Sequence, residues 1–235
     1  MDAAEDRLWW YRALHAQLLD AFGQTALPPG AAVLDAGCGT GGLLKRLGAI
    51  APERTRIGLD HEAVAATRAV RKSCAKVVLG SVDALPFADA SFGAIFSADV
   101  LYHREVDPLR AAREAYRCLM PEGMLVVNLP AFDWLASYHD RQVHGARRYN
   151  RAQVHALLAQ AGFTRIAVRY WNSLLFPLMV LRRLGPGSSR VDSDVSLPPW
   201  PIDAAFGAIT RIERLLMRWG LRFPAGGSVL AVAHR

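Results

Sequence analysis

The sequence predicts an α/β fold in which strands and helices alternate along the chain. Apolar runs of strand length are separated by stretches with the helical period, and this alternation extends from about residue 31 to residue 171. A chain of this kind builds a mostly parallel sheet with right-handed crossovers and helices on both faces. With 235 residues, 52% of them hydrophobic, it is long enough for one α/β domain with a large core.

The elements follow in order from the spacing of apolar residues. Residues 4–22 carry apolar side chains at the helical period, which predicts an N-terminal helix that covers the sheet. Strands are predicted at 31–36, 55–59, 76–79, 92–98, 124–129, 165–171 and 228–233. Helices are predicted between them at 42–50, 62–72, 108–119 and 151–161. Ligands of such a sheet bind at the carboxyl ends of its strands.

A long insertion separates the last two predicted strands. It runs from Asn172 to Gly227, which is far more than a hairpin needs. It contains an apolar helical start at 174–184, a Gly/Pro/Ser-rich linker at 185–201, and an amphipathic helix. That helix places on one face Ile202, Phe206, Ile209, Ile212, Leu216 and Trp219. We therefore expect a cover helix within 1–28 and a main domain at 29–235, with 172–227 as a helical lid or substrate subdomain.

Composition bounds the class of protein. The longest apolar run, Leu174 to Leu181, is too short for the ~20 residues of a membrane span. The first residues are acidic and lack the pattern of a signal peptide. Cys38, Cys74 and Cys118 are odd in number and lack metal-type spacing, which fits reduced thiols. These features favour a cytoplasmic protein, with membrane association as a further option.

The positive charge lies in the C-terminal part of the chain. Residues 1–130 contain 14 basic and 15 acidic side chains, whereas residues 131–235 contain 14 basic and 6 acidic ones. Arginine supplies 25 of the 28 basic residues, and its guanidinium favours carboxylate and phosphate partners. An anionic substrate, or peripheral contact with an anionic membrane through the basic insertion, follows from this. A solvated face produced by compositional bias explains the same charge.

A glycine-rich turn follows the first predicted strand. Gly37, Gly39 and Gly41 let the backbone turn sharply and approach a ligand closely. Glycine spacing alone fits a nicotinamide dinucleotide as well as other nucleotides. Asp35 favours a different ligand, since a buried carboxylate suits an ammonium or sulfonium group better than a diphosphate. Val33 to Gly42 resembles the first motif of the class I S-adenosylmethionine (SAM) dependent methyltransferases.

The resemblance extends over nearly the whole chain. The chain is similar to a subgroup of bacterial methyltransferases that carry a Trp-Trp helix, an H-D…R-R-Y loop and an Asn-x-Leu-Leu-Phe-Pro insertion. The resemblance implies a Rossmann-like sheet of seven strands in the order 3-2-1-4-5-7-6, with an antiparallel seventh strand. It also implies SAM as cofactor and S-adenosylhomocysteine as product. No metal site is predicted.

The cofactor residues come from the ends of the first strands. Asp60 ends the second strand and can accept both ribose hydroxyls, with His61 beside it; a helix N-cap is the alternative role for Asp60. The segment from Leu79 to Phe92 resembles the family's third-strand motif, but Ser81 stands where an adenine-binding Asp is usual. Ser81 and the amide of Val82 are the preferred adenine contacts, and Asp83 is the alternative.

The fourth strand and the cover helix supply further candidates. Ser97 lies where the resemblance implies a loop beneath the methionine part of SAM, and Tyr102 and His103 follow it. An imidazole can take the proton from an acceptor, so His103 is the candidate base; a loop-orienting histidine is the alternative. The resemblance also implies that N-terminal helices close over the cofactor. Tyr11 or Arg12 would then hold the methionine carboxylate.

The acceptor is expected near the loop after the fifth strand and the start of the insertion. This part of the chain holds its densest group of polar and aromatic side chains, and the candidate contacts are His139, His144, Arg147, Arg148, Tyr149 and Asn172. Tyr102, after the fourth strand, is a further candidate contact with the acceptor. Anion binding by the arginines is favoured over a metal site, and a structural salt-bridge loop is the alternative. The expected acceptor is a small or lipid-like molecule.

Three rival functions stay open. A nicotinamide-dependent reductase uses the same glycines, and a non-catalytic adenosyl-binding or membrane-surface protein would rely on the basic insertion. Nucleic acid as acceptor is disfavoured because the sequence has no basic platform interleaved with aromatic residues. The sequence does not indicate which acceptor atom is methylated or how many copies assemble.

Overall fold

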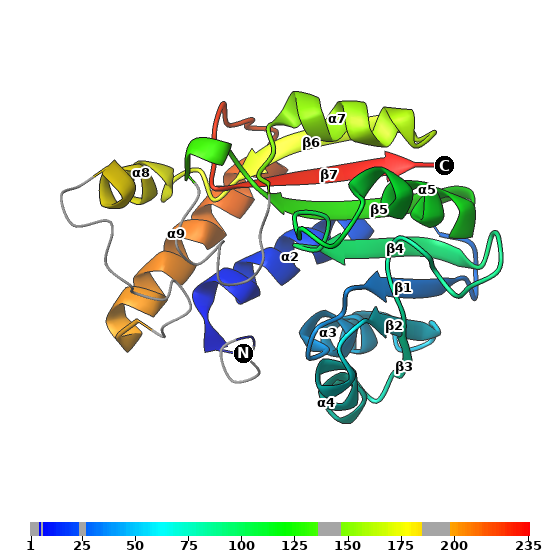
Figure 1. Cartoon of the computed structure of the whole chain (residues 1–235). Helices are drawn as coiled ribbons and strands as arrows, with labels where there is room; N and C mark the ends of the chain where they lie inside the picture. Colours follow the sequence, from blue (N-terminus) through cyan, green and yellow to red (C-terminus); the bar gives the residue numbers. More distant parts are fainter. Residues whose placement is uncertain (1–4, 6, 24–26, 136–146, 185–197) are drawn as a thin grey trace.

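The computed structural model describes residues 5, 7–23, 27–135, 147–184 and 198–235 (Figure 1). Its centre is a seven-stranded sheet in the order β3-β2-β1-β4-β5-β7-β6. β7 is antiparallel to both of its neighbours, and the other strand pairs are parallel. The predicted fold class and strand order are therefore confirmed.

The strands agree with the predicted ranges except at the fifth. They are β1 Ala32–Ala36, β2 Arg56–Asp60, β3 Lys76–Leu79, β4 Phe92–Ala98, β5 Leu119–Pro130, β6 Thr164–Trp171 and β7 Ser228–His234. β5 begins five residues before the predicted start at residue 124, because Leu119 already pairs with Phe92. The register then shifts before Met124, and Glu122 has a positive φ of 63° in between. The Pro121-Glu122-Gly123 signal marks this irregularity within the strand.

The helices also lie close to their predicted positions. They are α2 Trp9–Gly23, α3 Gly42–Ile50, α4 Ala63–Ser73, α5 Pro108–Cys118, α7 Arg151–Gln160, α8 Phe176–Leu184 and α9 Trp200–Arg218, with a 3-10 turn, η1, at Asp133–Leu135. Asp107 caps α5 by accepting from the amides of Leu109 and Arg110. Asn150 and Gln153 form a capping box at α7, so the chain leaves the preceding loop in a fixed direction.

Apolar side chains fill both sides of the sheet. One cluster joins α5 and α7 to the sheet through Ala112, Ala115, Val154 and Leu158. The cluster on the other face joins α2 and α3 to it, and its buried members include Leu14, Leu18, Leu43, Leu47, Phe96 and Trp171. Each fully buried leucine of this kind stabilises the fold by about 1.5–3 kcal/mol. The N-terminal helix therefore belongs to the core of the domain.

The insertion places α9 beside α2, whereas α8 lies beyond the end of β6 (Figure 1). The predicted apolar face of α9 does not all turn inward. Phe206 packs on Trp9 with ring centroids 5.4 Å apart, whereas Ile212 and Trp219 are exposed. Polar groups make much of the contact instead: Arg214 pairs with Asp20 at 2.5 Å, and buried Glu213 accepts from the amides of Ser173 and Leu174. The helical periodicity of apolar residues cannot predict these polar contacts, because the partners lie far apart in the sequence.

Candidate functional site

The turn between β1 and α3 adopts conformations that favour glycine. Gly37, Gly39 and Gly41 have φ values of 88°, 52° and 87°. The amides of Gly37 and Cys38 both donate to the carbonyl of Leu59 in β2, at 2.7 and 2.9 Å. A Cβ on Gly37 would lie 2.2 Å from Cγ2 of Val100, in the loop after β4. The turn therefore touches both neighbouring strands and leaves no room for a side chain at Gly37.

Asp35 lies directly below this turn and is buried. Burial, with further contributions from Glu5 and Asp60, raises the pKa of its carboxyl from 3.8 to about 8. These surroundings therefore disfavour the ionised carboxylate. A bound cation would reverse this preference, because an adjacent positive charge stabilises the carboxylate.

Asp60 connects the glycine turn to the end of β2. Its Oδ2 accepts from the amide of Gly39 at 2.8 Å, and its Oδ1 accepts from the amide of Glu62 at 2.9 Å. The second bond closes a turn ahead of α4, but Asp60 is not the helix N-cap: that position belongs to Glu62, whose side chain makes no capping bond. His61 is exposed, with Nδ1 3.6 Å from Oδ1 of Asp60. The two amides fix the orientation of the Asp60 carboxylate at the rim of the turn.

Glu5 occupies the start of α3, a contact that the sequence analysis missed. Its carboxylate accepts from the amide of Gly42 at 3.1 Å and from the hydroxyl of Thr40, and Nζ of Lys72 lies 3.1 Å away. The Glu5 and Lys72 side chains are both mostly buried. A helix N-terminus attracts an anion through its unpaired amides and dipole. Nothing in the sequence pattern connects Glu5 to a turn 35 residues later.

Replacement of Glu5 with glutamine tests its electrostatic effect on Asp35. The uncharged amide removes the second largest cause of the raised Asp35 pKa, so that pKa is expected to fall. Carboxyl chemical shifts followed across pH by NMR measure this directly in protein to which no cofactor has been added. Glu53→Gln is the matched control, because Glu53 is exposed and pairs with Arg54. An Asp35 titration that is identical in both variants would contradict the prediction.

The residues after β3 form a compact polar turn. Ser81 makes an isolated bridge with Ala84, and its hydroxyl donates to Oδ1 of Asp83. Oδ2 of Asp83 accepts from the amide of Asp107 at 3.2 Å, and Val82 is buried. Ser81 and Asp83, which the sequence offered as alternatives, are thus hydrogen-bonded to each other. The assignment of Ser81 and Val82 to a ligand stays a prediction.

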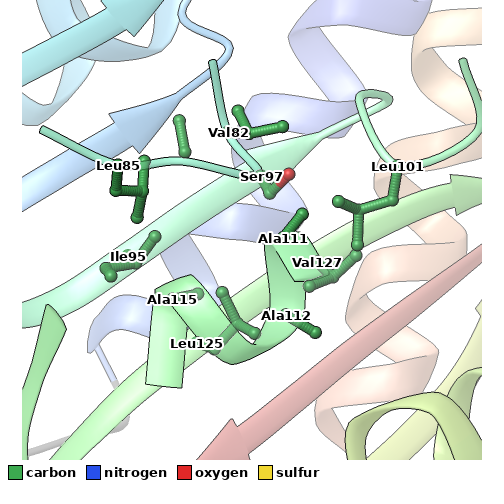
Figure 2. A pocket seen from close by; sticks show the side chains of 11 residues that line it. Val82, Leu85, Ile95, Ser97, Leu101, Ala111, Ala112, Ala115, Leu125 and Val127 are labelled. Atoms are coloured by element: carbon green, nitrogen blue, oxygen red, sulfur yellow. The ribbon is translucent and has the colours of Figure 1, made fainter. Parts of the chain in front are cut away.

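Ser97 is buried near the end of β4. Its hydroxyl has no hydrogen-bond partner among the residues that the structure describes. Figure 2 shows it beside a small cavity of about 20 Å³, together with Val82 and Leu101. The cavity is lined almost entirely by apolar side chains, which come from β1, β4, β5, α5 and the loops after β3 and β4. An unpaired buried hydroxyl is costly, so Ser97 has hydrogen-bonding capacity available at this edge of the sheet.

A buried network near the carboxyl ends of β4 and β5 connects the sheet to the cover helix. Nδ2 of Asn128 donates to Asp99 at 3.0 Å, and Nε1 of Trp171 donates to Oδ1 of Asn128 at 2.7 Å. Trp171 then stacks on Trp10 of α2, with ring centroids 6.3 Å apart. The sequence analysis did not identify Asn128 or Trp171. A single asparagine at the end of an apolar strand is the signal that would have found this network.

The two candidates on α2 point to different surroundings. Burial, Asp99 and Glu5 raise the pKa of Tyr11 to about 12, so its phenol lies close to the polar residues of the site. Arg12 instead forms an ion pair with Asp203 of α9, at 2.6 Å. Consecutive helical residues point about 100° apart, which separates them. Arg12 is thus paired with α9, and the assignment of Tyr11 or Arg12 to the methionine carboxylate stays a prediction.

The loop after β4 is held from the segment that precedes α7. The hydroxyl of Tyr149 donates to the carbonyl of Leu101 at 3.1 Å, and Arg147 donates to that of Val106 at 3.2 Å. Between these anchors, the rings of Tyr102 and His103 lie 4.3 Å apart, and both side chains are half-buried. Tyr149 is buried, so its hydroxyl positions the loop that carries His103.

The remaining acceptor candidates divide into three groups. Arg148 donates to the carbonyl of Ala131 and, through its amide, to Asp133. Asn172 is buried at the end of β6, where its Nδ2 contacts Sδ of Met179 and its Oδ1 has no partner in the described ranges. His139 and His144 lie outside the residues that the structure describes.

An aromatic cluster that the sequence analysis did not assign lies beside Asn172. Phe132 stacks on Tyr170 with centroids 5.1 Å apart, and Phe176 lies 5.7 Å from Phe132. Trp134 lies 6.0 Å from Phe176 and is exposed. These rings come from the segment after β5, from β6 and from α8. They give this edge of the sheet a partly exposed apolar surface next to the arginines.

Comparison with known proteins relates the residues around the glycine turn to methyltransferases. A family model described as a methyltransferase domain matches residues 34–127. A probable SAM-dependent methyltransferase of Mycobacterium tuberculosis is 29% identical over 74% of the chain and 64% of its own length. A human probable tRNA methyltransferase 9B is 30% identical over 48% of the chain and 24% of its own length. The chain thus spans about a quarter to two thirds of these curated relatives.

Solved structures agree with the fold. A geranyl diphosphate C-methyltransferase from Streptomyces coelicolor, in complex with Mg²⁺, geranyl diphosphate and S-adenosylhomocysteine, has a TM-score of 0.66. The two are 17% identical, and the match covers 95% of this chain and 79% of the other. At this identity the likeness concerns the fold.

Proposed function

Because the chain belongs to the class I SAM-dependent methyltransferases, we propose that it transfers the methyl group of SAM to a small or lipid-like, anionic acceptor. The cofactor site supports this proposal most directly. Asp35, the glycine turn and Asp60 all lie within the matched residues, and the Gly39–Asp60 hydrogen bond joins the turn to Asp60.

The donor side of the reaction rests on charge and hydrogen bonding. We assign the cationic methionine part of SAM to the vicinity of Asp35 and the ribose hydroxyls to Asp60, whose carboxylate two amides already orient. Ser81 and Val82 would contact the adenine, Ser97 offers a hydroxyl, and Tyr11 closes the site from α2. The sulfonium of SAM makes the methyl group electrophilic when the cofactor is bound.

The acceptor side rests on the surface around Asn172. An apolar part of the acceptor fits the aromatic cluster of Phe132, Trp134 and Phe176. The guanidinium groups of Arg147 and Arg148 favour an acceptor that also carries an anionic group. The diphosphate substrate named for the Streptomyces coelicolor protein is one molecule of this class. The human relative is named a probable tRNA methyltransferase, so tRNA is the competing acceptor class.

The reaction would proceed by in-line displacement. A lone pair of the acceptor attacks the methyl carbon, the carbon–sulfur bond breaks, and S-adenosylhomocysteine leaves. A proton released from the acceptor passes to His103 or to water. Most of the rate enhancement would come from alignment of the reactants and exclusion of water, to which the anchored loop around His103 contributes.

Incubation with methyl-labelled SAM tests the proposed function. Separate arms contain polar metabolites, extracted lipids and tRNA, and we expect label in the polar or lipid arm. The His103→Asn variant should bind SAM normally but turn over about 100-fold more slowly. Label in tRNA alone would overturn the acceptor class. Thermal stabilisation by NAD(P) and not by SAM would overturn the donor assignment.

A further inference from the structure

The outer face of α9 exposes a continuous apolar stripe. Its members recur at helical spacing along the full helix: Trp200, Ala204, Ala208, Ile212, Leu215 and Trp219. Trp200 and Trp219 are 81% and 82% exposed, and Ile212 and Leu215 are 54% and 50% exposed. No described segment covers this face, which we call the α9 stripe. Large exposed apolar patches of this kind mark interaction surfaces.

The opposite face of α9 holds the helix on the domain. It packs on α2 through Phe206 and the ion pairs of Asp203 with Arg12 and Arg214 with Asp20. Buried Glu213 binds the amides that follow β6. The stripe is therefore presented on a helix that is fixed by its other face.

The charged side chains around the α9 stripe are positive. Arg211 and Arg218 lie seven residues apart on one flank and are exposed, as is Arg222 just beyond the helix. Residues 198–235 contain only the acidic side chains Asp203 and Glu213, both of which bind partners on the inner side. The exposed side of α9 thus combines apolar and cationic groups.

We propose that the α9 stripe docks on the surface of an anionic phospholipid membrane. Tryptophans at both ends suit the headgroup level, Ile212 and Leu215 between them suit the acyl boundary, and the arginines suit lipid phosphates. A second copy would bring a like-charged face. The two rings of the stripe, Trp200 and Trp219, stand at opposite ends with aliphatic side chains between them, so they do not form the continuous row of aromatic side chains on which successive nucleic acid bases stack. None of the helices in the described part of the chain has the length and apolar character of a membrane span.

Flotation of the full chain with vesicles tests this without SAM, and so separately from the proposed reaction. We expect the protein to float with vesicles of phosphatidylcholine and phosphatidylglycerol, and far less with phosphatidylcholine alone. Trp200→Ala/Trp219→Ala should lower the bound fraction about tenfold. Arg211→Gln/Arg218→Gln should weaken binding and reduce its dependence on salt.

The control is Val64→Ala/Val70→Ala on α4, where both valines are exposed, at 56% and 45%. It should float like the unchanged protein, and thermal melts should show that all variants fold. Absence of flotation, or equal flotation of the tryptophan variant, would overturn the proposal. So would a dimer that the tryptophan change dissociates, or binding of the stripe to RNA in preference to vesicles.

Discussion

Replacement of Asp35 with asparagine is expected to weaken SAM binding about 100-fold while the protein keeps its fold. Loss of one partner of a buried charge pair costs ~2–5 kcal/mol of binding free energy. Asparagine has nearly the same shape as aspartate, so the packing around residue 35 changes little. Isothermal titration calorimetry with SAM measures the affinity, and a thermal melt of the free protein checks the fold.

The raised pKa of Asp35 gives the prediction a pH dependence with a definite sign. The folded-state pKa of about 8 lies above the ordinary value of 3.8. Asp35 therefore contributes stability that is fully present below about pH 4 and is lost as the pH rises towards 8. Bound SAM should reverse the preference for the protonated carboxyl, because its positive charge stabilises the ionised carboxylate. Binding below pH 8 then releases a proton, and the affinity should rise with pH until about that value.

The amide introduced by Asp35→Asn does not titrate. The variant should therefore release no proton from residue 35 on binding SAM, and its affinity should no longer rise with pH towards 8. Proton release on binding is read from the binding enthalpy in buffers that differ in their own ionisation enthalpy. Asp89→Asn is a suitable control, since Asp89 is exposed and lies at a distant ion pair with Arg117. If the Asp35→Asn variant bound SAM as tightly as the unchanged protein, the assigned role of Asp35 would be wrong.

Local sequence patterns predicted the positions of the strands and helices well because each element carries its own periodicity. The strand order and the antiparallel last strand were predicted from the family resemblance. The glycine turn, Asp35 and Asp60 were also predictable, since they lie within one strand–turn–helix unit and its neighbour. The start of β5 at Leu119 was not predictable in this way. Its early pairing with Phe92 depends on the neighbouring strand, and the Pro121-Glu122-Gly123 signal reads locally as a break.

The missed site residues share one physical cause, which is contact across long sequence separations. Glu5 reaches Gly42, and Asn128 reaches Trp171. Arg12 was proposed because the resemblance implies an N-terminal helix over the cofactor and because its charge suits a carboxylate; its partner Asp203 lies 191 residues away. Charge identifies which residues need a partner, while only the packing of α2 against α9 decides which partner they obtain.

Replacement of Gly37 with alanine is expected to destabilise the protein by about 3 kcal/mol, which corresponds to a loss of roughly 10 °C in Tm. Two effects add: φ of 88° is strained for alanine, and the new Cβ would lie 2.2 Å from Cγ2 of Val100. SAM affinity should fall as well, because the turn must shift.

Two further variants separate the effects of backbone strain and steric clash. Gly30 has φ of 72° and a Cβ added there would meet nothing within 4 Å, so Gly30→Ala carries strain alone and should cost about 1 kcal/mol. In Gly37→Ala/Val100→Ala the shortened side chain removes the closest contacts, so part of the stability lost in Gly37→Ala should return. Equal melting temperatures for Gly30→Ala and Gly37→Ala would contradict the clash. A rescue of stability and SAM affinity together would show that the glycine turn and the loop carrying His103 are packed as one unit, so that the donor site and the candidate base are positioned by the same contact.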